Sequence, residues 1–139
     1  MFEMFDAASR GDIDYASELQ IRIWLDGQSR EPTQLDSTLR VRALEMNRIS
    51  VERRTFLIAD MQPTCPLDPP AVDRLNEVDC PVMIVAGALD HPEVLRACDF
   101  VASHIPGARL EITPGCGHVP SFEQPELFSA LLLDFLAGC

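Results

Sequence analysis

The chain has 139 residues, 47% of them hydrophobic, which is the size and composition of one globular domain with an apolar core. Its formal net charge of −11 argues against the clustered positive charge by which proteins bind nucleic acid or anionic membrane surfaces. The five cysteines form no CxxC pair, so we expect neither a disulfide framework nor a metal site, and nothing implies a cofactor. The first residues do not resemble a secretory signal and no apolar run is long enough to span a bilayer, so we expect a cytoplasmic protein with no membrane partner.

The first 61 residues have the pattern of helices. A helix is predicted over Tyr15–Asp26, with Gly27 suited to ending it, and it places three large apolar side chains on one face: Leu19, Ile23 and Trp24. Trp24 is suited equally to lining a pocket under a lid and to packing in a helical core. The segment Pro32–Ile58 continues with leucines at roughly helical spacing, between arginines and acids, and predicts further helix.

A proline-rich connection with a short helix follows over residues 62–79. Four prolines fall within Gln62–Ala71, where they forbid a regular helix, and they mark a boundary between two halves of different texture.

Residues 80–139 alternate between strand and helix. The continuous apolar run Cys80–Gly87 is typical of a strand that is buried on both faces, and Ala108–Gly115 predicts a second strand. A helix is predicted between them, over Pro92–Ile105, so the order of elements indicates a right-handed βαβ unit with parallel strands. A closing helix over Pro125–Ala137 carries a core-facing stripe made of Leu127, Phe128, Leu131, Leu132 and Phe135.

Two ionisable residues directly follow the two predicted strands. Asp90 follows the first in GALDHP, and His118 follows the second in PGCGHVP. Ligands of open parallel sheets bind at the carboxyl ends of the strands, where adjacent loops lie side by side. A carboxylate from one loop can therefore reach the imidazole from the other, fix its tautomer and stabilise the imidazolium that forms when histidine acts as a base. Glycines at 115 and 117 let the backbone turn sharply around the histidine.

Each of these residues also has a plainer interpretation. Asp90 is suited to capping the helix that opens at Pro92, and both roles can coexist. His118 alone would be an ordinary loop residue. We expect His91 and His104 to face solvent, and the three histidines lack the close spacing of a metal site.

Two further features near His118 have alternative interpretations. Cys116 would share one tight turn with His118, and no orienting group is evident, so we do not expect a cysteine nucleophile. Glu123 and Glu126 are placed to favour the N-terminus of the last helix through its dipole.

Together these stretches resemble a known family. The segments PLDPPAVDRL, CPVMIVAGALDHPEV, IPGARLEITPGCGHVPSFEQPELF and LLLDFL are similar, in that order, to the C-terminal part of the α/β-hydrolase superfamily. The earlier stretch ELQIRIWLDG resembles part of the helical lid of the same family. The resemblance implies an α/β fold in which a lid segment (residues 1–61) and the connection (62–79) precede a β-α-β-α unit (80–139). It also implies that Asp90 matches the acid of the catalytic triad and His118 the triad histidine.

The sequence departs from the family at the nucleophile. A G-x-S-x-G elbow between strand and helix is expected ahead of the lid, and these residues contain none. The nearest approach, Gly27–Glu31, has Glu31 in place of the second glycine and Pro32 where a helix should open. The family's oxyanion-hole segment is absent too. The missing nucleophile could be a serine or an aspartate.

We therefore expect the C-terminal portion of an enzyme that hydrolyses a small, fairly hydrophobic ester, lactone or carbon–carbon substrate. The alternative is a catalytically inactive, truncated homologue that serves as an interaction or regulatory module or is a remnant. An experimental fragment of a longer enzyme is a third origin. Two parallel strands leave the inner edge of the first strand unpaired, which predicts a homo-oligomer formed by strand exchange or a partner chain carrying the N-terminal half of the hydrolase.

Overall fold

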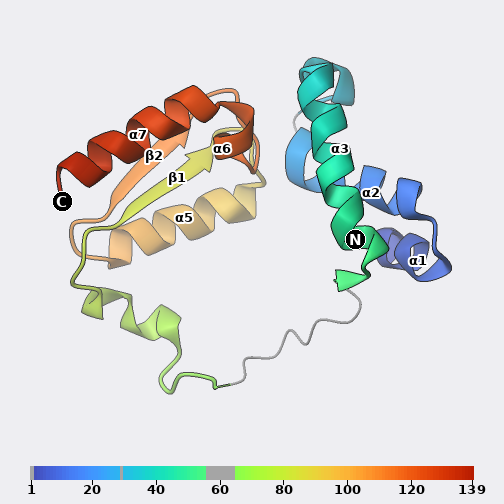
Figure 1. Ribbon diagram of the computed structural model, residues 1–139. Coiled ribbons are helices and arrows are strands. Elements are labelled where there is room, and N and C mark those ends of the chain that lie inside the picture. Colours follow the sequence, from blue (N-terminus) through green and yellow to red (C-terminus); the bar gives the residue numbers. More distant parts are fainter. Residues whose placement is uncertain (1, 29, 56–64) are drawn as a thin grey trace. The chain divides into compact units, whose positions relative to one another are not determined.

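The computed structural model describes residues 2–28, 30–55 and 65–139. The chain forms two compact units, residues 1–62 and 63–139, which are treated separately below (Figure 1). No helix within the described ranges is both long and apolar enough to cross a membrane.

The N-terminal unit is helical. Its elements are α1 (Phe2–Arg10), α2 (Ile13–Ile21), a π-helical turn (Arg22–Asp26), a 3₁₀ turn (Pro32–Gln34) and α3 (Ser37–Glu52). Aspartates cap the starts of α2 and α3: Asp12 accepts a hydrogen bond from the amide of Tyr15, and Asp36 accepts one from the amide of Leu39. Gly27, with φ of 74°, follows the π-helical turn, as expected for the residue that ends this stretch. The helix expected over Pro32–Ile58 is interrupted at Leu35 and Asp36, and its last residues lie outside the described ranges.

Small side chains make the core of this unit. Ala7, Ala16 and Val51 are almost fully buried against one another, which lets the three helices approach closely. The face of α2 that packs differs from the apolar face predicted from the sequence. Ala16, Ser17, Gln20 and Ile21 are the buried residues of α2. The side chains of Ile23 and Trp24 are instead 38% and 40% exposed.

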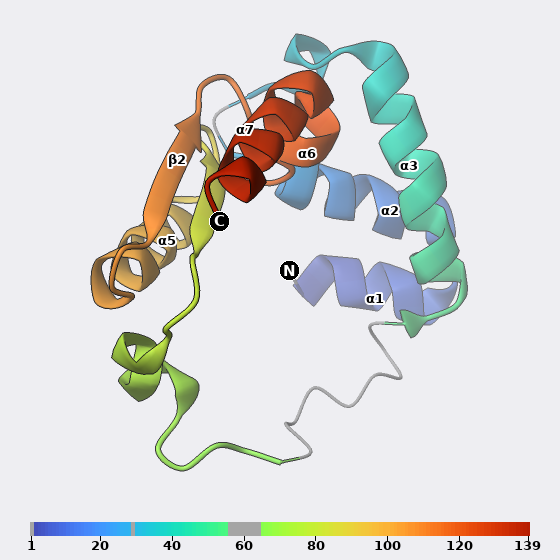
Figure 2. The same ribbon diagram turned by 60° about the vertical axis from the view of Figure 1, so that its left-hand side comes forward.

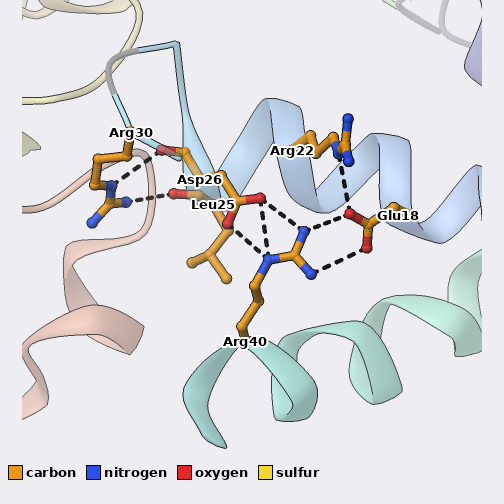
Figure 3. A network of polar contacts seen from close by, with 6 residues as sticks. All are labelled: Glu18, Arg22, Leu25, Asp26, Arg30 and Arg40. Atoms are coloured by element: carbon orange, nitrogen blue, oxygen red, sulfur yellow. Dashed lines mark hydrogen bonds and ion pairs between the residues drawn. The ribbon is translucent and has the colours of Figure 1, made fainter. Parts of the chain in front are cut away.

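A network of charges explains part of this difference (Figure 3). The guanidinium of Arg40, on α3, donates to both carboxylate oxygens of Asp26, at 2.8–3.2 Å, and to Glu18, at 2.7 and 3.1 Å. These hydrogen bonds lower the pKa of Glu18 and raise the pKa of Arg40. Arg30 donates to the backbone carbonyls of Leu25 and Asp26. The network draws the 2%-exposed Asp26 inward at the end of the π-helical turn.

The C-terminal unit is a two-stranded parallel sheet with helices. It contains a 3₁₀ helix (Ala71–Glu77), β1 (Met83–Gly87), α5 (Pro92–His104), β2 (Arg109–Thr113), α6 (Pro120–Glu123) and α7 (Pro125–Ala137). The strands pair in parallel from Met83 with Arg109 to Gly87 with Thr113, so their carboxyl ends are level. The parallel βαβ order predicted from the sequence is confirmed. Gly107, with φ of 74°, makes the turn between α5 and β2.

The helices α5 and α7 lie on opposite faces of this sheet (Figures 1 and 2). The layers cover the strands only in part. Met83, Ile84 and Val85 are half-buried, whereas the apolar run had predicted a strand buried on both faces. In α7, Phe128, Leu131 and Phe135 are half-buried, but two members of the predicted stripe, Leu127 and Leu132, are exposed. With one helix on each face, the strands are covered only in part, whereas full burial of a parallel strand requires both faces to be covered completely.

Candidate active site

The level carboxyl ends of β1 and β2 bring two loops together. The amide of Ala88 donates to the carbonyl of Thr113, which continues the ladder one residue past β1. The buried hydroxyl of Thr113 donates across the sheet to the carbonyl of Ala86 at 3.0 Å. These bonds fix the point at which each chain leaves the sheet, so the loops 88–91 and 114–119 begin side by side.

Asp90 and His118 meet between these loops. His118 Nδ1 lies 2.8 Å from Asp90 Oδ2, which is the contact that the parallel topology predicts. A carboxylate oxygen accepts hydrogen bonds, so the ring donates through an Nδ1 proton in this contact. The Asp90 side chain is 8% exposed and the His118 side chain 36%. A buried carboxylate thus orients a ring that reaches the surface, which is the arrangement of an acid and a base in hydrolytic triads.

A second hydrogen bond holds the carboxylate in place. Asp90 Oδ1 accepts from the backbone amide of His91 at 2.7 Å. His91 itself caps α5, because its Nδ1 accepts from the amide of Glu93 at 3.1 Å. The capping role considered for Asp90 therefore falls to His91, and Asp90 has one oxygen for the loop and one for the ring.

Close packing of backbone positions the histidine loop. A Cβ built on Gly87 would lie 1.9 Å from the carbonyl oxygen of Gly117 and 2.4 Å from that of Cys116. Only a glycine at position 87 allows this approach. Cys116 O accepts from the amide of Leu89 at 2.8 Å, and Gly115 turns with φ of 74°. The loop that carries His118 is therefore seated directly against the end of β1.

The other residues singled out in the sequence have different surroundings. Cys116 is fully buried, and His104 is exposed with its ring stacked on Phe100 at a centroid distance of 4.0 Å. The middle residue of the serine-containing stretch 27–31, Ser29, lies outside the described residues. Glu126 lies in the first turn of α7, as expected, but the carboxylate of Glu123 accepts from the amide of Gly117 at 2.8 Å. Nothing in the sequence pattern signalled that contact.

The sequence is similar to parts of several known hydrolytic enzymes. No family model matches the sequence. The chain is 41% identical over 55 residues to the pimeloyl-[acyl-carrier protein] methyl ester esterase of Nitrosomonas europaea, a match that covers 40% of this chain and 22% of the esterase. It is 38% identical over 64 residues to the proline iminopeptidase of Lactobacillus delbrueckii subsp. lactis, covering 46% of this chain and 21% of that protein. The matches thus span about a fifth of these relatives' lengths.

Solved structures match nearly the whole chain. Est816, described as an N-acyl homoserine lactone degrading enzyme, superimposes with a TM-score of 0.68 at 22% identity, covering 96% of this chain and 51% of that one. The carboxylesterase CesB from Bacillus subtilis gives a TM-score of 0.61 at 22% identity, covering 99% of this chain and 46% of that one. The fold is thus the C-terminal part of an α/β-hydrolase. The sequence and structure matches both point to the α/β-hydrolase superfamily, and the chain spans about half the length of the solved structures it resembles.

Proposed function

We propose that this chain supplies the acid and the base of an α/β-hydrolase active site whose nucleophile comes from residues outside this sequence. The single observation that carries the proposal is the 2.8 Å contact between His118 Nδ1 and Asp90 Oδ2 at the carboxyl ends of adjacent parallel strands. In the proposed reaction with a serine nucleophile, His118 Nε2 takes the hydroxyl proton as the serine attacks the substrate carbonyl, and then gives it to the leaving group. Asp90 stabilises the imidazolium that forms in between.

The proposed substrate is a small, fairly hydrophobic ester or lactone, with a carbon–carbon substrate as a further option. The relatives and solved structures support this, since their names specify a methyl ester esterase, a carboxylesterase and a lactone-degrading enzyme. We assign the N-terminal unit the role of a lid. Its exposed apolar side chains, which include Tyr15, Ile23 and Trp24, support an apolar substrate. The five free cysteines support a reducing compartment such as the cytoplasm.

The nucleophile-bearing segment is proposed to pair with the free edge of β1. Val82 O and Ala88 N face β2, so the alternation of the strand directs the amides and carbonyls of Met83 and Val85 to the opposite edge. Among the described residues no strand pairs with that edge. Nearby, β1 and α5 line an open groove of about 350 Å³ formed by Ile84, Glu93, Val94, Ala97, Cys98 and Val101. A partner chain that carries the N-terminal half, or a second copy through strand exchange, would cover both features.

The test is reconstitution. The chain is co-expressed with the part of the Bacillus subtilis carboxylesterase that it does not match, complex formation is followed by light scattering after size exclusion, and turnover of 4-nitrophenyl butyrate is measured. We expect hydrolysis by the complex and a loss of about 10,000-fold in kcat for His118→Ala. His104→Ala, which changes an exposed histidine away from the site, is the matched control and should keep full activity.

Three results would count against the proposal. Turnover that survives His118→Ala would remove the base from its assigned role. A stable complex without turnover would favour the alternative function, an interaction or regulatory module without catalysis. Hydrolysis by the chain alone, dependent on His118, would place the nucleophile within these 139 residues.

A further inference from the structure

The peptide bond that precedes the Gly117–His118 step is held at both of its polar ends. Its carbonyl, from Cys116, accepts from the amide of Leu89 at 2.8 Å. Its N–H, from Gly117, donates to Glu123 Oε1 at 2.8 Å. The C=O and N–H of a trans peptide point in opposite directions, so two short hydrogen bonds at its two ends fix the orientation of the peptide plane.

We propose that Glu123 is a positioning residue, whose carboxylate sets the His118 ring against Asp90 by clamping this peptide from the side opposite β1. The proposal rests on the function proposed above only in treating His118 as a base; the clamp itself is a matter of geometry. Glu123 does not touch the substrate or the reacting atoms in this role.

The hydrogen bond between Glu123 and Gly117 closes a short loop of the chain. Glu123 ends α6, which begins two residues after His118, so the loop runs out from the histidine and returns its carboxylate to the amide just before it. The backbone supports this return, because the amides of Phe122 and Glu123 both donate to the carbonyl of Val119. The contact to Gly117 is thereby local and is formed within seven residues.

On the other side, this loop packs directly against the backbone at the end of β1. The carbonyl of Gly117 lies against Gly87, in a space that would not admit even a Cβ. The loop is therefore confined between the end of β1 and the Glu123 carboxylate. Without the carboxylate, the Gly117 amide loses this acceptor, and the peptide plane that precedes His118 is held less firmly against β1.

The charge of Glu123 matters to the strength of the clamp. A hydrogen bond from a backbone amide to a carboxylate is shorter and stronger than one to a neutral acceptor. Glutamine keeps an acceptor oxygen of the same reach without the charge, and alanine removes the acceptor. Because a displacement of about 1 Å is enough to spoil a catalytic contact, the consequence of losing the acceptor should appear at the imidazole of His118.

The experiment uses the full chain, labelled with ¹⁵N, at pH 7.5. Long-range ¹H–¹⁵N spectra report the tautomer of His118 and its Nδ1 proton, and amide hydrogen exchange reports Gly117. The variants are Glu123→Ala, Glu123→Gln and the control Glu126→Ala, which removes a nearby exposed carboxylate. Amide resonances of β1 and β2 check that each variant is folded.

In the wild type and in Glu126→Ala we expect the Nδ1–H tautomer with a downfield Nδ1 proton. In Glu123→Ala we expect that resonance to be lost while the β1 and β2 resonances remain, and Gly117 exchange to be about tenfold faster or more. Glu123→Gln should restore the Nδ1 proton and move the Gly117 amide proton upfield, because the neutral acceptor is weaker.

A folded Glu123→Ala variant that keeps the wild-type Nδ1 resonance would overturn the proposal. If that variant unfolds, Glu123→Gln decides: an unshifted Gly117 amide proton would show that the carboxylate is not its acceptor. Neither readout depends on hydrolysis, so failure of the clamp and failure of the proposed enzymatic function are told apart.

Discussion

Replacing Gly87 with alanine would put a methyl group where the histidine loop now lies. The new Cβ would be 1.9 Å from the carbonyl oxygen of Gly117 and 2.4 Å from that of Cys116, and both obstacles are backbone. To move from 1.9 Å to an ordinary contact of at least 3.4 Å, the loop must retreat by about 1.5 Å, which would break the 2.8 Å hydrogen bond between Leu89 N and Cys116 O. We therefore expect Gly87→Ala both to destabilise the C-terminal unit and to separate His118 from Asp90.

The magnitude follows from these two losses. Overpacking costs about 1–3 kcal/mol, and the lost hydrogen bond adds about 0.5–1.5 kcal/mol, so the free energy of unfolding should fall by about 2–4 kcal/mol. For a unit of this size, each kcal/mol lowers Tm by about 4–8 °C, so a drop of at least about 8 °C is expected. Thermal unfolding followed by circular dichroism measures Tm, and the Nδ1 proton of His118 reports the separation.

Two other glycines separate the causes. Gly107 has φ of 74° but open space around a Cβ, so Gly107→Ala isolates backbone strain, about 1–2 kcal/mol. Gly138 has φ of −93° and a nearest contact of 3.6 Å, so Gly138→Ala should change stability by less than about 0.5 kcal/mol. If the Gly87→Ala protein has the same Tm as the Gly138→Ala protein and keeps the Nδ1 proton resonance of His118, the reasoning from close approach is refuted.

Three further predictions concern the N-terminal unit, and urea unfolding checks each. Arg40→Met leaves the buried Asp26 carboxylate without its guanidinium and should lower the free energy of unfolding by about 3 kcal/mol. Arg22→Met removes a 60%-exposed partner of Glu18 and should lower it by less than about 1 kcal/mol. Equal losses would contradict the buried network. Arg40 lowers the pKa of Glu18 below its usual 4.5, so the stability that this ion pair contributes is present above pH 4.5 and is lost as the pH falls through the lowered pKa. Arg40→Met should therefore make the free energy of unfolding less dependent on pH in this range. An unchanged slope between pH 6 and 3 would argue against the role of the pair. Asp36→Ala removes the N-cap of α3 and should cost about 1 kcal/mol, and no loss would show that the cap is dispensable.

The C-terminal unit could be predicted well from the sequence because its signals are local. The apolar runs, Pro92 at the start of a helix and Gly107 after one fix the βαβ order, and parallel pairing then brings the loops of Asp90 and His118 together. The catalytic roles of the two residues stay a prediction. The sequence predicts more burial of β1 than the structure shows. An apolar run indicates a strand suited to burial, but it does not indicate how much of each face neighbouring helices cover.

The N-terminal unit was harder to predict, because its packing depends on distant charge pairs. The apolar side chains of Ile23 and Trp24 favoured one face of the helix, but Asp26 is drawn inward by Arg40, 14 positions away. Periodicity cannot indicate a partner at that distance. Glu123 was assigned to a helix dipole for a similar reason: its amide partner is set by a backbone turn, which residue spacing does not encode.

The Asp90–His118 pair also bears on how such proteins can be recombined. The two residues are 28 positions apart, and every hydrogen bond described between their loops comes from the same stretch of chain. Recombination at a point ahead of residue 80 would transfer both side chains, the strand register that aligns them and the Glu123 clamp together into another protein. Exchange between related genes would therefore vary the N-terminal unit without rebuilding the alignment of carboxylate and imidazole.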